Sequence, residues 1–158
     1  MKKQEIYYCP ICGYELPDYF GSGELCPCCF REAGYDDEIY YSELETKDLL
    51  NQNIYKKLDI SEVIKVIPDY ERKKNLEEDV PEKMIWAYLR AVWIKGGSFY
   101  IRDEIHKNEK NYKKCEPDWT KEKAYRQLKR IGVDAREFIK SIWGKESELY
   151  KEAVEILK

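Results

Sequence analysis

The stretch "CPICGYELPDYFGSGELCPCC", from Cys9 to Cys29, decides the predicted fold. It holds five of the six cysteines of the chain, and the glycines and prolines among them favour tight turns over a helix. Two C-x2-C pairs, Cys9 with Cys12 and Cys26 with Cys29, are separated by thirteen residues. Two such knuckles, each a turn that presents two sulfurs, form a tetrahedral site that suits Zn²⁺. We therefore predict that these four cysteines bind one structural zinc ion.

The extra cysteine, Cys28, leaves the ligand choice of the second knuckle open. Pairing Cys28 with Cys29 gives the alternative spacing C-x2-C-x15-C-C. We prefer Cys26 and Cys29, because this pair repeats the spacing of Cys9 and Cys12. Cys28 is then a buried or neighbouring thiol. Disulfides are the weaker hypothesis, because the N-terminus lacks the apolar segment of a secretory signal and so favours the cytoplasm, where thiols stay reduced.

The pattern along the chain predicts an α+β protein. We expect a small cysteine-rich module in residues 1–37, zinc-ribbon-like or rubredoxin-like, followed by a mainly α-helical body in residues 38–158. A module of this size buries too little apolar surface to fold alone, so it needs an additional stabilising element such as a bound metal ion. The strongest helix signal is "VPEKMIWAYLRAVWIKGG", residues 80–97, whose predicted apolar face comprises Ile85, Tyr88, Leu89, Val92 and Trp93. Further helices are expected in residues 42–58, 121–132, 135–144 and 145–158.

Charge is distributed unevenly along a chain of net charge −3. Residues 1–50 carry four basic and eleven acidic side chains, a net of −7, whereas the remaining residues carry a net of +4. An acidic surface favours a basic partner protein, because complementary charge speeds encounter. Nucleic acid is a less favoured partner, because few basic residues accompany the cysteines. The hydrophobic runs are too short to predict a membrane segment.

No pattern of residues predicts an enzyme. Four cysteines fill a tetrahedral zinc site, whereas a catalytic zinc keeps an open position. His106, the one histidine, stands far along the chain and is expected to be a solvated surface residue. Cys115 is isolated, although Lys113 and Lys114 beside it would favour its thiolate. We predict a non-enzymatic protein with no catalytic residue.

The cysteine stretch resembles the CPCC family of small cysteine-rich bacterial proteins. The family has a CPxCGY knuckle and a CPCCG-x-E-F-G-Y-D knuckle, and the matching positions here are Cys9, Pro10, Cys12, Gly13, Tyr14, Cys26, Pro27, Cys28, Cys29, Glu32, Gly34, Tyr35 and Asp36. A looser resemblance covers residues 86–131, through Trp93, Ile94, Gly97, Phe99, Tyr100, Pro117, Trp119, Gln127 and Leu128. Phe30 stands where the family has Gly, residues 38–80 resemble an insertion, and residues 134–158 resemble a C-terminal helical extension.

The resemblance implies zinc binding through the four spaced cysteines and a protein partner. Some family members are thought to be immunity proteins that neutralise toxins. Two alternatives remain. "YYCPICGYEL" also resembles the first knuckle of rubredoxins, and the adjacent Cys28-Cys29 pair resembles the iron site of desulforedoxin, which together imply an iron electron carrier. A nucleic-acid-binding zinc ribbon is the other alternative, with the basic residues of "YERKKN" and "KEKAYRQLKR" as its candidate contacts.

Overall fold

The computed structural model describes residues 5–158. Residues 1–4 belong to the predicted cysteine-rich module and to the N-terminus that we predict not to be a secretory signal, and they lie outside the described residues. A small antiparallel sheet begins the described chain, formed by β1 (Tyr7–Tyr8) and β2 (Glu15–Leu16). Tyr7 pairs with Leu16 and Tyr8 with Glu15. This hairpin carries the first C-x2-C pair in its loop, and the elements that follow it are helical. The protein is therefore of the α+β class, as predicted.

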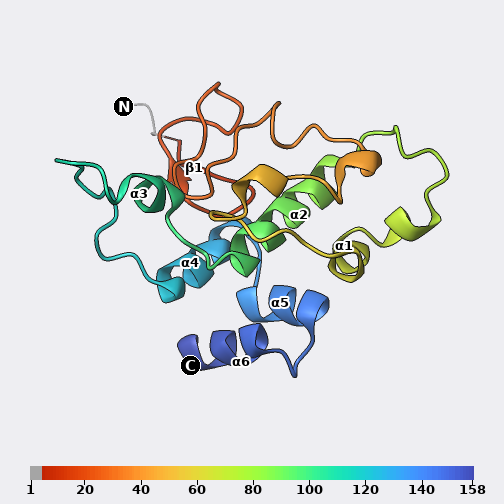
Figure 1. Cartoon of the computed structure of the whole chain (residues 1–158). Helices are drawn as coiled ribbons and strands as arrows, with labels where there is room; N and C mark the ends of the chain where they lie inside the picture. Colours follow the sequence, from red (N-terminus) through yellow and green to blue (C-terminus); the bar gives the residue numbers. More distant parts are fainter. Residues whose placement is uncertain (1–4) are drawn as a thin grey trace.

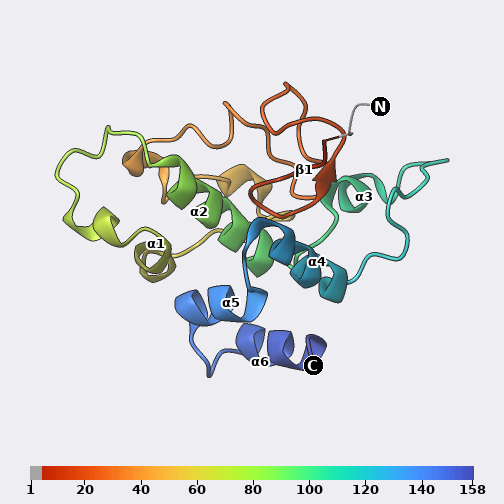
Figure 2. The same ribbon diagram turned by 180° about the vertical axis from the view of Figure 1, so that it is seen from behind.

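The helical part contains six α-helices and four short 3-10 helices within residues 5–158. In chain order they are η1 (Tyr41–Glu43), η2 (Leu49–Asn51), α1 (Ile60–Val66), η3 (Pro68–Arg72), α2 (Glu82–Lys95), α3 (Ile101–His106), α4 (Lys121–Gln127), η4 (Leu128–Ile131), α5 (Ala135–Trp143) and α6 (Glu148–Ile156). Helix α2 lies in the middle of the molecule, between the N-terminal loops and the α5–α6 pair (Figures 1 and 2). Helix α1 packs on both α2 and α5, and α4 packs on α6.

Helices α4, α5 and α6 lie within the ranges predicted for them, and a side chain caps the start of each. The side chains of Thr120, Asp134 and Ser147 accept hydrogen bonds from backbone N–H groups in the first turns of α4, α5 and α6. Gly132 follows η4 with φ of 75°, a left-handed conformation that glycine adopts at low cost. The predicted apolar face of α2 is buried, and Arg90, Ala91 and Ile94 are buried with it. Helix α2 is therefore enclosed on nearly every side along its C-terminal half.

The predicted helix over residues 42–58 is wrong. That segment contains only the short turns η1 and η2, with irregular chain between and after them. Asp48 has φ of 65°, which a continuing right-handed helix does not admit. Its two carboxylate oxygens accept hydrogen bonds from Arg31 Nη1 at 3.0 Å and Nη2 at 2.6 Å. A buried long-range ion pair thus overrides the local helical pattern.

The cysteines belong to the same hydrophobic core as the helices. Cys9, Cys12, Cys26, Cys28 and Cys29 are fully buried and form one cluster with the apolar side chains of α1, α2, α4 and α5. The division of the chain into a module of residues 1–37 and a body of residues 38–158 stays a prediction. Buried side chains from both ranges pack in this one core. No helix in residues 5–158 has the length and apolar character needed to cross a membrane.

Candidate metal centre

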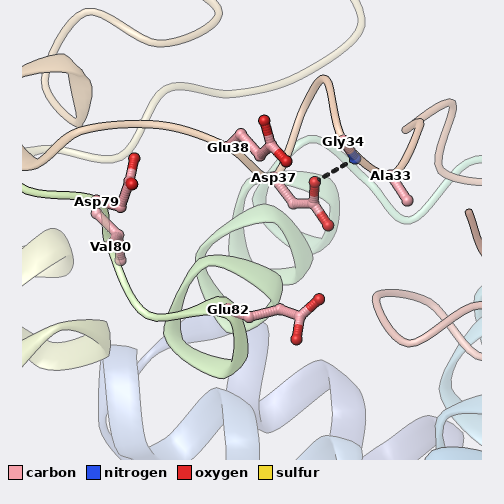
Figure 3. A pocket seen from close by; sticks show the side chains of 7 residues that line it. All are labelled: Ala33, Gly34, Asp37, Glu38, Asp79, Val80 and Glu82. Carbon is pink, nitrogen blue, oxygen red and sulfur yellow. Dashed lines mark hydrogen bonds between the residues drawn. The ribbon is translucent and has the colours of Figure 1, made fainter.

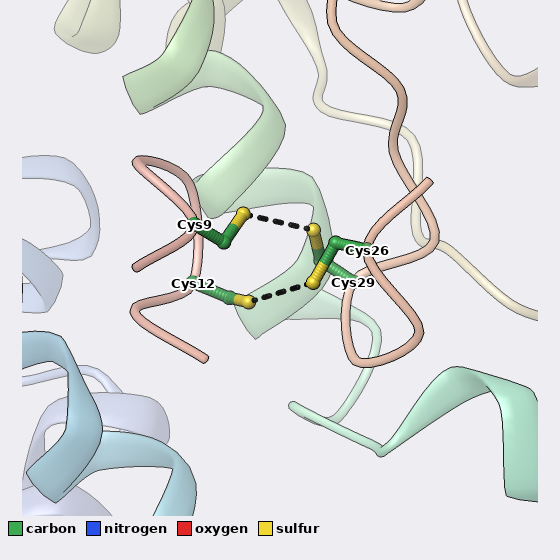
Figure 4. A group of neighbouring side chains, drawn as sticks. All are labelled: Cys9, Cys12, Cys26 and Cys29. Carbon is green, nitrogen blue, oxygen red and sulfur yellow. Dashed lines mark hydrogen bonds between the residues drawn. The ribbon is translucent and has the colours of Figure 1, made fainter. Parts of the chain in front are cut away.

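Four cysteine side chains converge in the core beside α2 (Figure 4). The Sγ atoms of Cys9, Cys12, Cys26 and Cys29 all lie within 4.8 Å of one another. Sγ of Cys9 is 3.7 Å from that of Cys29, and Sγ of Cys12 is 3.6 Å from that of Cys26. Zn–S bonds of about 2.3 Å in a tetrahedron place the sulfurs about 3.8 Å apart. The donor set and its spacing therefore fit one tetrahedrally bound metal ion.

The same distances argue against disulfides. A disulfide joins its sulfurs at about 2.05 Å, and the six cysteines are free thiols in this structure. The four cysteines predicted as ligands are thus the ones that come together, two from each knuckle.

The two knuckles have matching backbones. In the first, Gly13 N–H donates to Cys9 O at 2.8 Å and Cys9 N–H donates to Tyr14 O at 2.9 Å. In the second, Phe30 N–H donates to Cys26 O at 2.7 Å and Cys26 N–H donates to Arg31 O at 2.9 Å. Phe30 takes φ of 62°, close to the left-handed conformation of Gly13 at 82°. The second knuckle therefore keeps its geometry although a bulky residue stands at the glycine position.

This match assigns a place to Cys28. The knuckles align as C-P-I-C and C-P-C-C, so Cys28 takes the position of Ile11. Both side chains are fully buried, and the four-sulfur group does not include Cys28. Gln127 Nε2 lies 3.5 Å from Cys28 Sγ. Cys28 therefore packs like the apolar residue at the matching position, and the alternative pair Cys28 with Cys29 does not make up the cluster.

The carbonyl groups of the first knuckle are bound by side chains from distant helices. Arg90 of α2 donates through Nε to Ile11 O and through Nη2 to Pro10 O, each at 2.7 Å. Gln127 of α4 donates through Nε2 to Cys12 O at 2.9 Å. A Cβ atom at Gly13 would lie 2.3 Å from Gln127 O, so the knuckle and α4 approach at backbone distance. The first knuckle therefore contacts α2 and α4 closely, in addition to contributing two cysteines to the four-sulfur group.

The second knuckle is bound mostly by backbone. At the start of α3, Ile101 N–H donates to Cys28 O at 2.9 Å and Arg102 N–H donates to Pro27 O at 3.1 Å. Tyr55 donates its hydroxyl proton to Cys29 O at 3.0 Å. The Arg31 guanidinium lies over the Tyr55 ring at 3.9 Å. The two knuckles thus have equivalent carbonyls satisfied by different parts of the chain.

A buried positive charge, that of Arg90, lies close to the four thiols. Burial lowers the pKa of Arg90 to about 10, and Cys9, Cys12 and Cys29 oppose that shift. Arg90 donates to carbonyls and has no carboxylate partner among residues 5–158. Four thiolates around a divalent cation would carry a net charge of −2, and the Arg90 guanidinium would supply an opposite charge beside them. Arg90 is therefore both a hydrogen-bond donor and a counter-charge for the centre.

Burial and neighbouring thiols shift the pKa values of Cys9, Cys12 and Cys29 in different directions. Burial raises the pKa values of Cys12 and Cys29. At Cys9 burial acts in the same direction, but hydrogen bonds from Cys12, Cys26 and Cys29 outweigh it and lower the pKa. Four adjacent thiolates in this buried cluster would require a cation to offset their charge.

The other candidate residues lie apart from this centre. His106 is half-buried, with Nδ1 2.8 Å from Glu109 Oε1. Cys115 is exposed, with Sγ 3.8 Å from the Tyr112 hydroxyl. Neither belongs to the four-sulfur group. Sequence reasoning gave no role at this centre to Arg90, Gln127 or Tyr55. Two signals were available: Arg90 is a single arginine inside the otherwise apolar "MIWAYLRAVWI", and Gln127 is one of the positions of the looser family resemblance.

Comparisons with models of protein families, with curated proteins and with solved structures find no match to this chain.

Proposed function

We propose that the four cysteines bind a structural zinc ion in a protein that does not use the metal for catalysis. One observation carries this proposal: the four cysteines are fully buried and their sulfurs lie within 4.8 Å of one another, as the ligands of one tetrahedral ion would. Such a site leaves no position for water or substrate. The zinc-ribbon-like character of the N-terminal module belongs to the same proposal, supported by the two matching knuckles.

Metal content tests this proposal against the iron alternative. Purified protein should contain one zinc ion per chain and should be colourless. An iron electron carrier with a ferric four-sulfur centre would be red and would bleach on reduction. Iron at one equivalent in protein purified without added metal would overturn the zinc assignment and favour the rubredoxin-like or desulforedoxin-like alternative.

The second part of the proposal is that the protein acts by binding a basic protein. Its support is a pocket of about 410 Å³ beside the second knuckle, the acidic pocket, lined by Ala33, Gly34, Asp37, Glu38, Asp79, Val80 and Glu82 (Figure 3). Glu38, Asp79 and Glu82 are exposed. Asp37 is buried, and its carboxylate accepts from Gly34 N–H at 2.7 Å and Trp86 Nε1–H at 3.0 Å. The acidic pocket therefore suits lysine or arginine side chains.

The CPCC resemblance narrows the kind of partner. It supports an immunity role, in which an acidic protein neutralises a toxin, for example a basic nuclease. The high negative charge of residues 1–50 favours fast association with such a partner. We propose this role as the specific case of the binding function, and the cytoplasm as its location.

Charge reversal tests the binding role. Glu38→Lys combined with Glu82→Lys should abolish specific capture of a basic protein from the native host and slow its association. Glu146→Lys combined with Glu148→Lys is the matched control, because it makes the same charge change at two exposed residues outside the acidic pocket. Capture that persists in the double variant, or that is lost equally in the control, would contradict the use of this surface.

A further inference from the structure

A second pocket lies against the first knuckle and has the opposite character. This first-knuckle pocket has a volume of about 380 Å³ and is lined by Tyr14, Glu116, Trp119, Lys123, Arg126, Gln127 and Arg130. Its volume is within the usual range for small-molecule sites. Three of its side chains are basic and one is acidic, whereas the acidic pocket has four carboxylates and no basic residue in its lining.

Two aromatic residues of this pocket are held in place by hydrogen bonds. The Tyr14 hydroxyl donates to Glu116 Oε1 at 2.8 Å, and Trp119 Nε1–H donates to Ser98 O at 2.9 Å. Both rings pack on Tyr100, with ring centroids 5.3 Å and 5.6 Å away. Both residues remain partly exposed. The pocket therefore has fixed aromatic walls, which reduces the ordering cost of binding a flat ring.

The basic residues come from one face of α4 and η4. Lys123, Arg126 and Arg130 follow at intervals of three and four residues, so they lie along the same side of the helix. All three are exposed. Arg126 Nε pairs with Glu122 at 3.0 Å, and Arg130 Nη1 donates to Gly13 O at 3.3 Å. These contacts orient the guanidinium groups and leave other N–H donors for an anion.

Gln127 adds an uncharged polar group. It is 6% exposed, and its Nε2 is engaged by the first knuckle. Gln127 lines the pocket, and within residues 5–158 no donor forms a hydrogen bond with its Oε1. This oxygen can accept a hydrogen bond from an N–H group in the pocket.

We propose that the first-knuckle pocket binds a nucleotide unit. Tyr14 and Trp119 contact the base, Gln127 Oε1 accepts from a base N–H group, and Lys123, Arg126 and Arg130 bind the phosphate. Aromatic walls beside basic side chains match the two chemical parts of a nucleotide, whereas a bare anion would use only the basic residues. This function is independent of the acidic pocket and of the proposed protein partner.

The nucleotide bound in this pocket could be a free nucleotide or one unit of a single-stranded nucleic acid. Beyond Arg130 lies a neighbouring pocket of about 360 Å³, lined by Tyr8, Pro10, Lys83, Trp86, Arg90 and Ile131. The Arg130 guanidinium lies over the Tyr8 ring at 5.3 Å, so this residue connects the two pockets. Aromatic and basic residues thus continue past the first-knuckle pocket, as a second nucleotide of a strand would require.

Binding of defined probes by the full metal-containing chain tests the proposal. The probes are AMP, inorganic phosphate and a labelled oligothymidine of about eight nucleotides, a length within the range of single-strand sites. We expect AMP or the oligonucleotide to bind, with an affinity that falls as salt increases. Preference for the oligonucleotide identifies a strand, and equal affinity per nucleotide identifies a free nucleotide. No binding of either at millimolar concentration, or equal competition by phosphate, would overturn the proposal.

Matched lysine variants localise the binding. Lys123→Glu should weaken binding by about tenfold or more at low salt, because it replaces a phosphate contact by a repelling charge. Lys129→Glu makes the same charge change at an exposed lysine of η4 that does not line the pocket, and should change affinity less than about twofold. Arg126→Gln provides a second test without charge reversal. Equal losses in the Lys123 and Lys129 variants would contradict a site in this pocket.

Discussion

The two cysteine knuckles have the same backbone but are attached to the protein differently. Carbonyls of the first knuckle accept from the side chains of Arg90 and Gln127, which stand far along the chain. The equivalent carbonyls of the second accept from backbone N–H groups at the start of α3 and from Tyr55. The carbonyl groups of each knuckle need hydrogen-bond donors from elsewhere in the protein, and unrelated elements provide these donors in the two knuckles. The first knuckle should therefore be more sensitive to single side-chain changes.

Substitutions of Cys29 and Cys28 in the second knuckle should differ most, because only Cys29 belongs to the four-sulfur group. Cys29→Ser should lose stoichiometric metal, because it removes one of four thiolates. Cys28→Ala should retain one metal ion per chain, because Cys28 matches Ile11 in the first knuckle and fills space in the core. Metal content and thermal unfolding of the two purified variants are the measurements. Metal loss in Cys28→Ala would revive the pair Cys28 with Cys29 as ligands.

Arg90 should give the next largest effect. Arg90→Met keeps much of the side-chain volume but leaves two carbonyls of the first knuckle without donors and removes the counter-charge of the thiolates. We expect a loss of about 3–5 kcal/mol in the free energy of unfolding, measured by denaturant titration of the metal-loaded protein.

Tyr55→Phe is the corresponding change at the second knuckle. It removes the hydroxyl donor to Cys29 O and should cost about 1–3 kcal/mol. If Tyr55→Phe destabilises the protein more than Arg90→Met does, the proposed difference between the knuckles is wrong.

The glycine position of each knuckle gives a more specific comparison. Gly13→Ala should cost about 3 kcal/mol, because the added Cβ meets Gln127 O in a left-handed backbone conformation. At Phe30 the backbone strain is already present. Phe30→Gly should therefore be more stable than Phe30→Ala by about 1 kcal/mol, since both lose the ring but only glycine relieves the strain. Equal stability of the two Phe30 variants, measured by denaturant unfolding, would exclude that strain.

Local patterns in the sequence predict much of the fold and the four cysteines that come together in the core. The C-x2-C spacing identifies Cys9, Cys12, Cys26 and Cys29, and the predicted ranges 121–132 and 135–144 contain α4 and α5. These features depend on residues close together in the chain.

Long-range pairing accounts for what could not be predicted. The Arg31–Asp48 ion pair replaces the expected helix in residues 42–58 by turns, and no local pattern indicates it. The contacts of Arg90 and Gln127 with the first knuckle likewise cross about half the chain or more. A hydrogen-bond donor for a distant carbonyl has no characteristic spacing, so these residues emerge only when the chain is folded.

The central claim is that a metal ion bound by the two knuckles stabilises the helical body, because both share one core. Thermal unfolding followed by the far-ultraviolet circular dichroism of the helices tests it most directly, with and without an excess of a zinc chelator. We predict that removal of the metal lowers the midpoint of helix unfolding and that one equivalent of Zn²⁺ restores it. A helical transition that stays at the same temperature after complete metal removal would contradict the claim.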